Sequence, residues 1–251
     1  MKEMSRFSLL DIAPTAANVL GISLQQSDGH PIDAVASWGC KNVVLIIVDS
    51  LGYDLCMWLR PKLKNISALA DQGFVFTAKA VSNHTTPSIA TILSGLLPEH
   101  HQILDKQGAK DSRLLSLPEI ASAFGLKSAV IMEENGAQVY QGLIEIVGAV
   151  SDKLSPKEFD REICTRTLEA LSLRPKLLVT YFIGIDKIVH MGLGPKDILE
   201  AALLIDGCIG EIVRAADSKT LFIICGDHPV HSGRLKRTKE PYCVALIMAH
   251  N

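Results

Sequence analysis

Acidic residues and histidines stand directly after three of the most apolar runs in the chain. They are Asp49, Asp186, His190, Asp227 and His228. Carboxylate oxygens and imidazole nitrogens together form a ligand set that suits zinc or manganese. An acid after a strand is often only a helix cap. The adjacent Asp-His pair and the Asp and His spaced by one helical turn favour a metal site instead.

A hydroxyl that could act as a nucleophile lies in the segment His84-Thr85-Thr86-Pro87-Ser88, just before a helical-looking stretch. Thr85 could attack an ester if a metal ion lowered the pKa of its hydroxyl. The start of the following helix would favour an anionic substrate through its dipole. The alternative is that Thr85 only caps that helix.

The apolar runs 43–48, 177–185 and 220–226 predict the strands that must position these side chains. Continuous runs rich in β-branched residues are typical of strands buried on both faces of a parallel sheet. Ligands bind at the carboxyl edge of such sheets, and each run ends at an acid. The three runs therefore predict a common site at one sheet edge.

Helical patterns alternate with these and further strand-like segments. Helices are expected at 63–72, 117–124, 157–171 and 196–215, with further strands at 74–76 and 127–132. Residues 7–22 also suggest a helix, with Asp11 as its cap and Gly21 as its end. The alternation predicts an α/β fold of three layers, with a mostly parallel central sheet between helices, in a single domain spanning residues 1–251.

Composition limits the choice of partner. The 251 residues are 48% hydrophobic and 21% charged, with a formal net charge of -2. This balance gives no electrostatic argument for nucleic acid or a membrane surface. The charged start of the chain develops no secretory segment, so a cytoplasmic location is expected. Six scattered cysteines are expected to be free thiols, and the oligomeric state stays open.

Several motifs resemble those of the alkaline phosphatase superfamily, and they occur in that family's order. They are Val48-Asp49, Thr85-x-Pro87-Ser88, Ser94-Gly95-Leu96-Leu97-Pro98-Glu99-x-His101, Asp186-x-x-x-His190 and Gly226-Asp227-His228. The superfamily includes nucleotide pyrophosphatase/phosphodiesterases, cofactor-independent phosphoglycerate mutases, phosphopentomutases and sulfatases. The resemblance covers residues 42–103 and 177–246, and it implies an alkaline phosphatase-like fold.

The resemblance also implies two divalent metal ions, zinc or manganese. Thr85 would attack phosphorus, and the resulting phospho-threonine would then be hydrolysed, as in two-metal phosphoryl chemistry. The ligands implied for one ion are Asp49, Thr85, Asp227 and His228, and those for the other are Asp186 and His190. His101 is expected to be structural.

In the family the second ion normally has a further histidine ligand, and this chain departs from that pattern. An ungapped comparison places Arg237 there, and arginine stays protonated and cannot bind a metal. His231 is the nearest substitute, while His250 and His30 are less favoured. Without a substitute, the protein would bind one metal or be inactive.

Residues 7–22 resemble a segment that members of this family normally carry after the last strand. Its place at the start of this chain suggests a circular permutation. In relatives that are not permuted, the positions equivalent to the two termini of this chain are joined. Met1 and Asn251 are therefore expected to lie close together.

The resemblance favours a phosphodiesterase or phosphatase. Sulfatases of the superfamily use a cysteine or serine converted to formylglycine, with an arginine after the Pro-Ser pair, whereas this chain has Thr85 and Ile89. Its mutases carry a large inserted domain for which this chain is too short. A phosphomutase, a phosphonate hydrolase and a noncatalytic binding domain are the alternatives, and the expected partner is a small phosphorylated substrate.

Two charged segments lie beside the predicted site. The basic segment 234–239 could bind phosphate, although a solvated loop is favoured for it. Glu133 and Glu134 follow another strand and could face the same cleft. No role is assigned to either glutamate.

Overall fold

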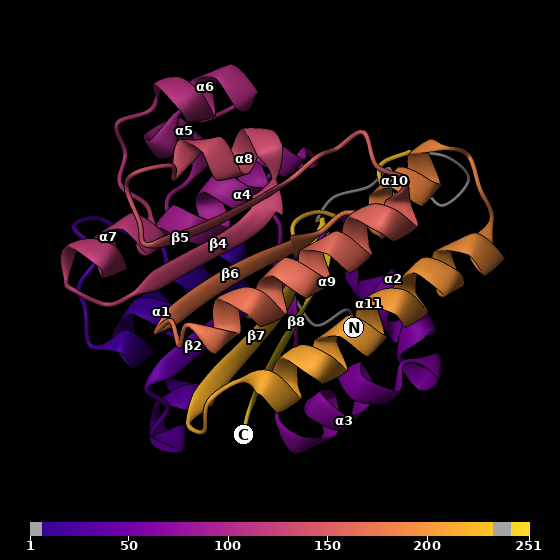
Figure 1. Cartoon of the computed structure of the whole chain (residues 1–251), viewed down its shortest axis with the longest axis horizontal. Coiled ribbons are helices and arrows are strands. Elements are labelled where there is room, and N and C mark those ends of the chain that lie inside the picture. Colours follow the sequence, from indigo (N-terminus) through magenta and orange to yellow (C-terminus); the bar gives the residue numbers. More distant parts are fainter. Residues whose placement is uncertain (1–6, 233–241) are drawn as a thin grey trace.

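The computed structural model describes residues 7–232 and 242–251, and within them one eight-stranded sheet forms the centre of the molecule (Figure 1). The order across the sheet is β1-β3-β8-β7-β2-β6-β4-β5. The strands are β1 Phe7–Ser8, β2 Asn42–Val48, β3 Phe74–Lys79, β4 Ser128–Glu133, β5 Ile146–Val150, β6 Leu177–Phe182, β7 Thr220–Gly226 and β8 Cys243–His250. Only the pairs that include β8 are antiparallel among these strands. The predicted mostly parallel sheet is confirmed.

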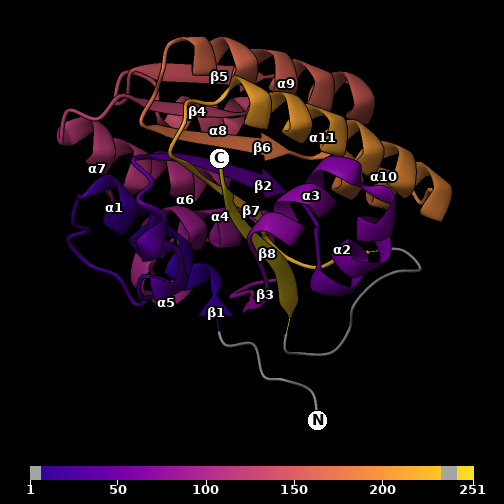
Figure 2. The ribbon, with the colours of Figure 1, turned by 90° about the horizontal axis from the view of Figure 1, so that it is seen from below.

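Helices cover both faces of the sheet and complete the predicted three layers. Helices α2, α3, α9 and α11 lie on one face, and α1, α4 and α7 lie on the other (Figure 2). Helices α5, α6 and α8 gather near α4, and α10 follows β6 directly. The α-helices are α1 Ile12–Leu20, α2 Tyr53–Leu59, α3 Lys64–Gln72, α4 Thr85–Ser94, α5 Pro98–His101, α6 Lys106–Asp111, α7 Leu117–Ala123, α8 Glu134–Val139, α9 Pro156–Ser172, α10 Gly184–His190 and α11 Pro195–Ala215.

Three parallel strands at the centre end at the same level. Strand β2 lies between β6 and β7, and Val48 pairs with Phe182 on one side and Gly226 on the other. Every residue of these three strands is buried. Because the side chains are apolar on both faces, helices must cover both faces. The register therefore brings the residues that follow the three strands to one edge.

Most predicted elements match the observed ones within a few residues. The expected helices at 63–72, 117–124, 157–171 and 196–215 correspond to α3, α7, α9 and α11. Asp11 occupies the N-cap position of α1, as expected, but its side chain makes no capping hydrogen bond. That carboxylate instead accepts hydrogen bonds from the backbone N–H groups of Ser8 (2.8 Å) and His30 (3.0 Å). These bonds connect the loop after α1 back to its start.

The first described residues extend the edge of the sheet. Phe7 pairs with Ala78 of β3, and Ala78 in turn pairs with Val244 near the start of β8. Asn251 follows the opposite end of β8. Met1 lies outside the described residues, so the expected proximity of the termini and the circular permutation stay predictions.

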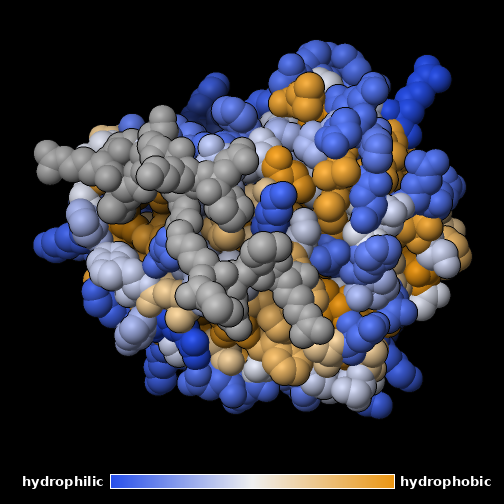
Figure 3. Space-filling view, turned by 180° about the vertical axis from the view of Figure 1, so that it is seen from behind, coloured by the Kyte–Doolittle hydropathy of each residue, from blue (hydrophilic) through white to orange (hydrophobic). Residues whose placement is uncertain are grey.

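The surface mixes hydrophilic and hydrophobic residues (Figure 3). Among the described residues, no helix is long and apolar enough to cross a membrane. All six cysteines are free, as expected. The pattern of scattered cysteines therefore reflects packing rather than covalent cross-links.

Candidate active site

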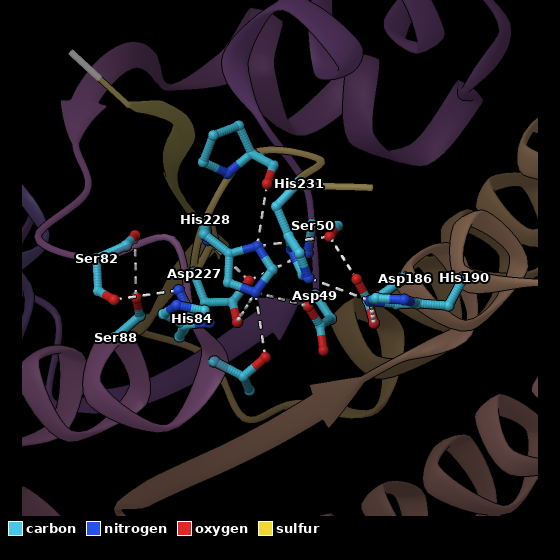
Figure 4. A network of polar contacts seen from close by, with 12 residues as sticks. Asp49, Ser50, Ser82, His84, Ser88, Asp186, His190, Asp227, His228 and His231 are labelled. Atoms are coloured by element: carbon cyan, nitrogen blue, oxygen red, sulfur yellow. Dashed lines mark hydrogen bonds and ion pairs between the residues drawn. The ribbon is translucent and has the colours of Figure 1, made fainter. Parts of the chain in front are cut away.

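The structure brings the predicted residues together at the carboxyl edge of the sheet (Figure 4). They form two groups, in each of which the potential ligand atoms lie within 4.8 Å of one another. The first group is Asp49, Asp227 and His228, and the second is Asp186, His190 and His231. The groups agree with the division that the sequence suggested, and the role of each residue as a ligand stays a prediction.

The side chain of His228 is the centre of the first group. Its Nε2 atom lies 3.1 Å from Thr85 Oγ1 and 3.4 Å from both Asp49 Oδ1 and Asp227 Oδ2. Its Nδ1 atom lies 3.1 Å from the carbonyl oxygen of Pro229. Because a carbonyl can only accept a hydrogen bond, Nδ1 carries the proton. In neutral His228, the lone pair of Nε2 therefore points toward the carboxylates, as in a metal-binding imidazole.

The first group fits a divalent cation. Asp49 Oδ1 and Asp227 Oδ2 are buried and have no hydrogen-bond partner. Burial, followed by the nearby carboxylates of Asp227 and Asp186, raises the pKa of Asp49 well above its usual range. Burial also raises the pKa of Asp227. Buried carboxylates of this kind need a proton or a cation, and a metal ion among these oxygen and nitrogen atoms would supply the missing charge.

The second group is more open to solvent. His190 Nε2 lies 3.2 Å from His231 Nε2 and 3.4 Å from Asp186 Oδ2. The His190 side chain is 49% exposed, whereas that of Asp186 is 17% exposed. His231 thus lies within 4.8 Å of the other two potential ligands, and its role as the third ligand stays a prediction. Arg237 and the basic segment 234–239 lie outside the described residues. The donor set of two imidazoles and one carboxylate fits a zinc site with an open position.

Thr85 is the first residue of α4 and does not act as its cap. The capping position belongs to His84, and no side chain caps the helix. The sequence predicted a helix after the segment 84–88, whereas α4 begins inside that segment, at Thr85. The first N–H groups of a helix have no partner within it, so the start of α4 offers donors and a positive dipole end beside the Thr85 hydroxyl.

Ser50 connects the two groups and was missed by the sequence analysis. Its hydroxyl donates a hydrogen bond to Asp186 Oδ1 (2.7 Å) and lies 3.5 Å from His228 Nδ1. Its backbone N–H donates to Asp227 Oδ1 (3.1 Å). Ser50 is fully buried and has φ 62°, in the left-handed region that non-glycine residues rarely adopt. This backbone turn points both the N–H and the hydroxyl into the site.

Tyr181 also supports the first group and was not predicted as a site residue. Its hydroxyl, from within β6, donates a hydrogen bond to Asp49 Oδ2. The bond fixes one oxygen of Asp49 and leaves Oδ1 facing His228. Burial raises the pKa of the Tyr181 hydroxyl, followed by the charge of Asp49. The tyrosine therefore stays protonated and acts as a donor.

Asp160 of α9 anchors the start of α10, the helix that carries Asp186 and His190. Its Oδ1 atom accepts hydrogen bonds from the N–H groups of Ile183 (3.1 Å) and Gly184 (3.2 Å). A Cβ atom at Gly184 would collide with the Asp160 carboxylate, so the close approach requires glycine there. Asp160 thereby fixes the position of the second group from outside it.

His101 has a structural role, as expected. It is buried, its Nδ1 atom accepts a hydrogen bond from the N–H of Ile103 (2.9 Å), and its Nε2 atom lies 3.2 Å from Thr91 Oγ1. Burial lowers the pKa of His101. A neutral imidazole in this position fastens the turn that follows α4.

A cavity of about 420 Å³ opens at the site. Asp49, Thr85 and Asp186 line one part of it. Glu133 also lines the cavity, whereas Glu134 is not among its lining residues. The space next to Thr85 is therefore large enough for a small organic ester.

Comparisons with known proteins agree with this architecture. The model of the Sulfatase family, which is part of the alkaline phosphatase superfamily, matches residues 41–164. Among solved structures, a 2-O GAG sulfatase aligns with a TM-score of 0.65 and 13% identity, covering 84% of this chain and 64% of the sulfatase. The chain has an alkaline phosphatase-like fold.

Two other solved structures share this alkaline phosphatase-like fold. Phosphonoacetate hydrolase from Sinorhizobium meliloti 1021 has a TM-score of 0.61 and 13% identity, with 75% of this chain and 56% of the hydrolase covered. The lipoteichoic acid synthase LtaP from Listeria monocytogenes has a TM-score of 0.55 and 13% identity, with 94% and 71% covered. No curated protein matches the chain in sequence. With 64% of the sulfatase and 56% of the phosphonate hydrolase covered, this chain spans less than two thirds of the length of either protein.

Proposed function

We propose that this protein is a metal-dependent hydrolase of phosphate esters, with Thr85 as its nucleophile and two divalent ions as cofactors. The observation that carries the proposal is the 3.1 Å distance between Thr85 Oγ1 and His228 Nε2. It places a hydroxyl beside an imidazole nitrogen and two buried carboxylate oxygens that have no hydrogen-bond partner. A threonine that only begins a helix does not require buried carboxylates and an imidazole beside its hydroxyl.

Bound divalent ions would lower the pKa of the Thr85 hydroxyl and offset the negative charge of the phosphate oxygens. Asp49, Asp227 and His228 would hold one ion, and Asp186, His190 and His231 the other. Zinc and manganese both suit these nitrogen and oxygen donors.

The reaction is an in-line substitution at phosphorus. Thr85 Oγ1 loses its proton to solvent and forms a bond to phosphorus, while the bond from phosphorus to the ester oxygen breaks and the leaving alcohol takes a proton from water. The backbone N–H groups of Thr85 and Thr86 at the start of α4 would orient the phosphate oxygens. Water then attacks the phospho-threonine, which releases phosphate, or a monoester from a diester, and restores Thr85.

The residue type at position 85 favours phosphate over sulfate. Sulfatases of the superfamily use a cysteine or serine converted to formylglycine, and a threonine is not a substrate for that conversion. The expected arginine position after Pro87-Ser88 holds Ile89. The match to the Sulfatase family supports the alternative, which is a sulfate ester as the substrate.

Other activities keep the same site with a different outcome. A phosphonate hydrolase would cleave a carbon–phosphorus bond, and the fold similarity to phosphonoacetate hydrolase supports its inclusion in the test. A phosphomutase would return the phosphate to another hydroxyl. A noncatalytic domain would bind anions without turnover. We propose a small phosphorylated substrate and a cytoplasmic location, with no nucleic-acid or membrane partner.

The test compares 4-nitrophenyl phosphate, a 4-nitrophenyl phosphodiester, 4-nitrophenyl sulfate and phosphonoacetate. Protein stripped of metal and refilled with zinc or manganese is assayed beside Thr85→Ala and the control Thr165→Ala, an exposed threonine of α9 outside the cavity. The proposal expects metal-dependent hydrolysis of a phosphate ester that falls by at least a hundredfold only in Thr85→Ala. Turnover of the sulfate alone, or equal rates in wild type and Thr85→Ala, would refute it.

A further inference from the structure

One face of α4 forms a continuous wall of the cavity. The residues on this wall are Thr85, Thr86, Ile89, Ala90, Leu93 and Ser94. They form three adjacent pairs, 85/86, 89/90 and 93/94, and the pairs repeat every four residues, so they lie on a single helical face. At a rise of 1.5 Å per residue, this face extends roughly 13 Å from Thr85 to Ser94. The cavity is therefore elongated, with the proposed nucleophile at one end and apolar side chains beyond it.

The remaining walls carry further apolar side chains beside charged ones. Helices α6 and α8 lie near α4 (Figure 1), and residues of both line the cavity. Side chains from these and neighbouring segments that line it are Ile103, Leu114, Met132, Val139 and Leu143. Several of them lie in separate elements. An apolar lining that several elements build together is typical of a ligand pocket.

Polar groups at the far end of the cavity already have partners. The hydroxyl of Ser94 donates a hydrogen bond to the carbonyl of Ala90 (2.6 Å). The hydroxyl of Ser116 donates to Glu119 (2.9 Å) and lies 3.2 Å from the hydroxyl of Tyr140. Because these groups satisfy one another, a ligand at this end would not need to supply polar atoms.

The lysines of α6 at this cavity are engaged as well. Lys106 Nζ lies 3.6 Å from Glu133 Oε1, and Lys110 Nζ donates to Asn135 Oδ1 (3.3 Å). The Lys106 side chain lines the cavity and is 58% exposed, so its charge is paired with Glu133 and reached by solvent. These contacts give no reason to expect a second anionic group on the ligand away from Thr85.

We infer that the substrate is an amphiphile: an ester whose charged group lies at Thr85 and whose organic group is an elongated, uncharged apolar chain along α4. This inference rests on the proposed function for the position of the charged end. An apolar chain fits because the cavity is continuous with Thr85 along an apolar helix face. The polar groups Ser94, Ser116, Lys106 and Lys110 already have partners within the protein. Burial of each methylene group increases affinity about fourfold.

Isothermal titration calorimetry with methyl-, butyl- and octylphosphonate, using zinc-loaded protein, measures this dependence. These probes contain no ester bond, so binding is measured apart from turnover. The expected dissociation constant falls about fourfold per methylene group until the apolar face is covered. A dissociation constant that stays the same from methyl- to octylphosphonate would overturn the inference.

Two matched pairs of variants locate the binding of the alkyl chain. Leu143, which lines the cavity, is 53% exposed, and Leu173, outside it, is 52% exposed. Leu143→Asn should weaken octylphosphonate binding about threefold to tenfold, with methylphosphonate and the Leu173→Asn control unchanged. Ala90→Phe should fill the cavity and remove the chain-length dependence, whereas Ala123→Phe on α7 should preserve it. A dependence that survives both Leu143→Asn and Ala90→Phe would place the chain elsewhere and refute the inference.

The same experiment separates this inference from the proposed function. A chain-length dependence that Ala90→Phe abolishes, in a protein without Thr85-dependent turnover, would support the apolar pocket and reject the catalytic proposal. Thr85-dependent hydrolysis of a phosphate ester with no preference for longer chains would do the reverse.

Discussion

Replacing Ser50 tests whether one buried residue positions both groups of the site. Ser50→Ala removes the hydroxyl that donates to Asp186 but keeps a side chain at φ 62°. A hydrogen bond to a charged group contributes about 1.5–3 kcal/mol, so the free energy of unfolding should fall by about that amount. Ser50→Gly loses the same bond, but glycine tolerates the left-handed backbone, which should offset about 1 kcal/mol of the loss.

Metal affinity should respond differently from stability. Both variants release Asp186 from its fixed orientation, so both should bind the second ion about 10- to 100-fold more weakly, as for other residues that orient ligands. Urea unfolding of the metal-free protein measures the stability difference, and zinc titration against a competing chelator measures affinity. Wild-type affinity for two ions in Ser50→Ala, or equal stability of the alanine and glycine variants, would refute the reasoning about the hydroxyl or the backbone, respectively.

Three further predictions concern residues that surround the metal ligands and the ions themselves. Tyr181→Phe keeps the ring but loses the donor to Asp49, so affinity for the first ion should fall about 10- to 100-fold; an unchanged zinc titration would contradict this. Burial raises the pKa of Asp160 from 3.8 to about 7, so the folded protein holds this proton more tightly than the unfolded chain and loses stability as pH rises from about 4 to 7. The stability of Asp160→Asn relative to wild type should therefore rise over that range by at most about 4 kcal/mol and level off above it, and a difference that is constant with pH in urea unfolding would argue against it. Chelation should lower the melting temperature in calorimetry, because an ion at a thousand times its dissociation constant stabilises by about 4 kcal/mol; insensitivity to chelator at every metal concentration would exclude bound ions.

The central strands and the location of the site could be predicted from sequence because burial leaves a direct trace there. A strand covered on both faces must be apolar along its whole length, so the acid that ends each run marks the sheet edge. Asp49, Asp186 and Asp227 follow such runs, and their backbone registers agree with a common edge. The mostly parallel α/β architecture follows from the same pattern.

Ser50 and Tyr181 could not be predicted because their roles depend on tertiary contacts. A serine after an aspartate is ordinary in sequence, and nothing local indicates a positive φ there. Tyr181 lies in an apolar run, where an aromatic residue suggests core packing, yet its hydroxyl reaches Asp49 across neighbouring strands. The partner that gives each residue its role is more than a hundred positions away in the chain.

The cavity was also beyond the sequence analysis. Helices α6 and α8 each have six residues, too few to establish a helical period of apolar residues. The apolar side chains that they and their flanking loops contribute look scattered in sequence. Only the packing of these short helices near α4 shows that they enclose one space.

The order of the strands has a consequence for when the site can form during synthesis. The two partners of Ser50, Asp186 and Asp227, follow it in the chain by 136 and 177 positions. Contacts of such long range form slowly, because a large loop must close before they contribute. A nascent chain therefore lacks both ligand groups until residue 231 has left the ribosome and β7 has joined β2. Metal uptake would then come at the end of folding, and a truncated chain would carry no partly assembled centre able to attack esters.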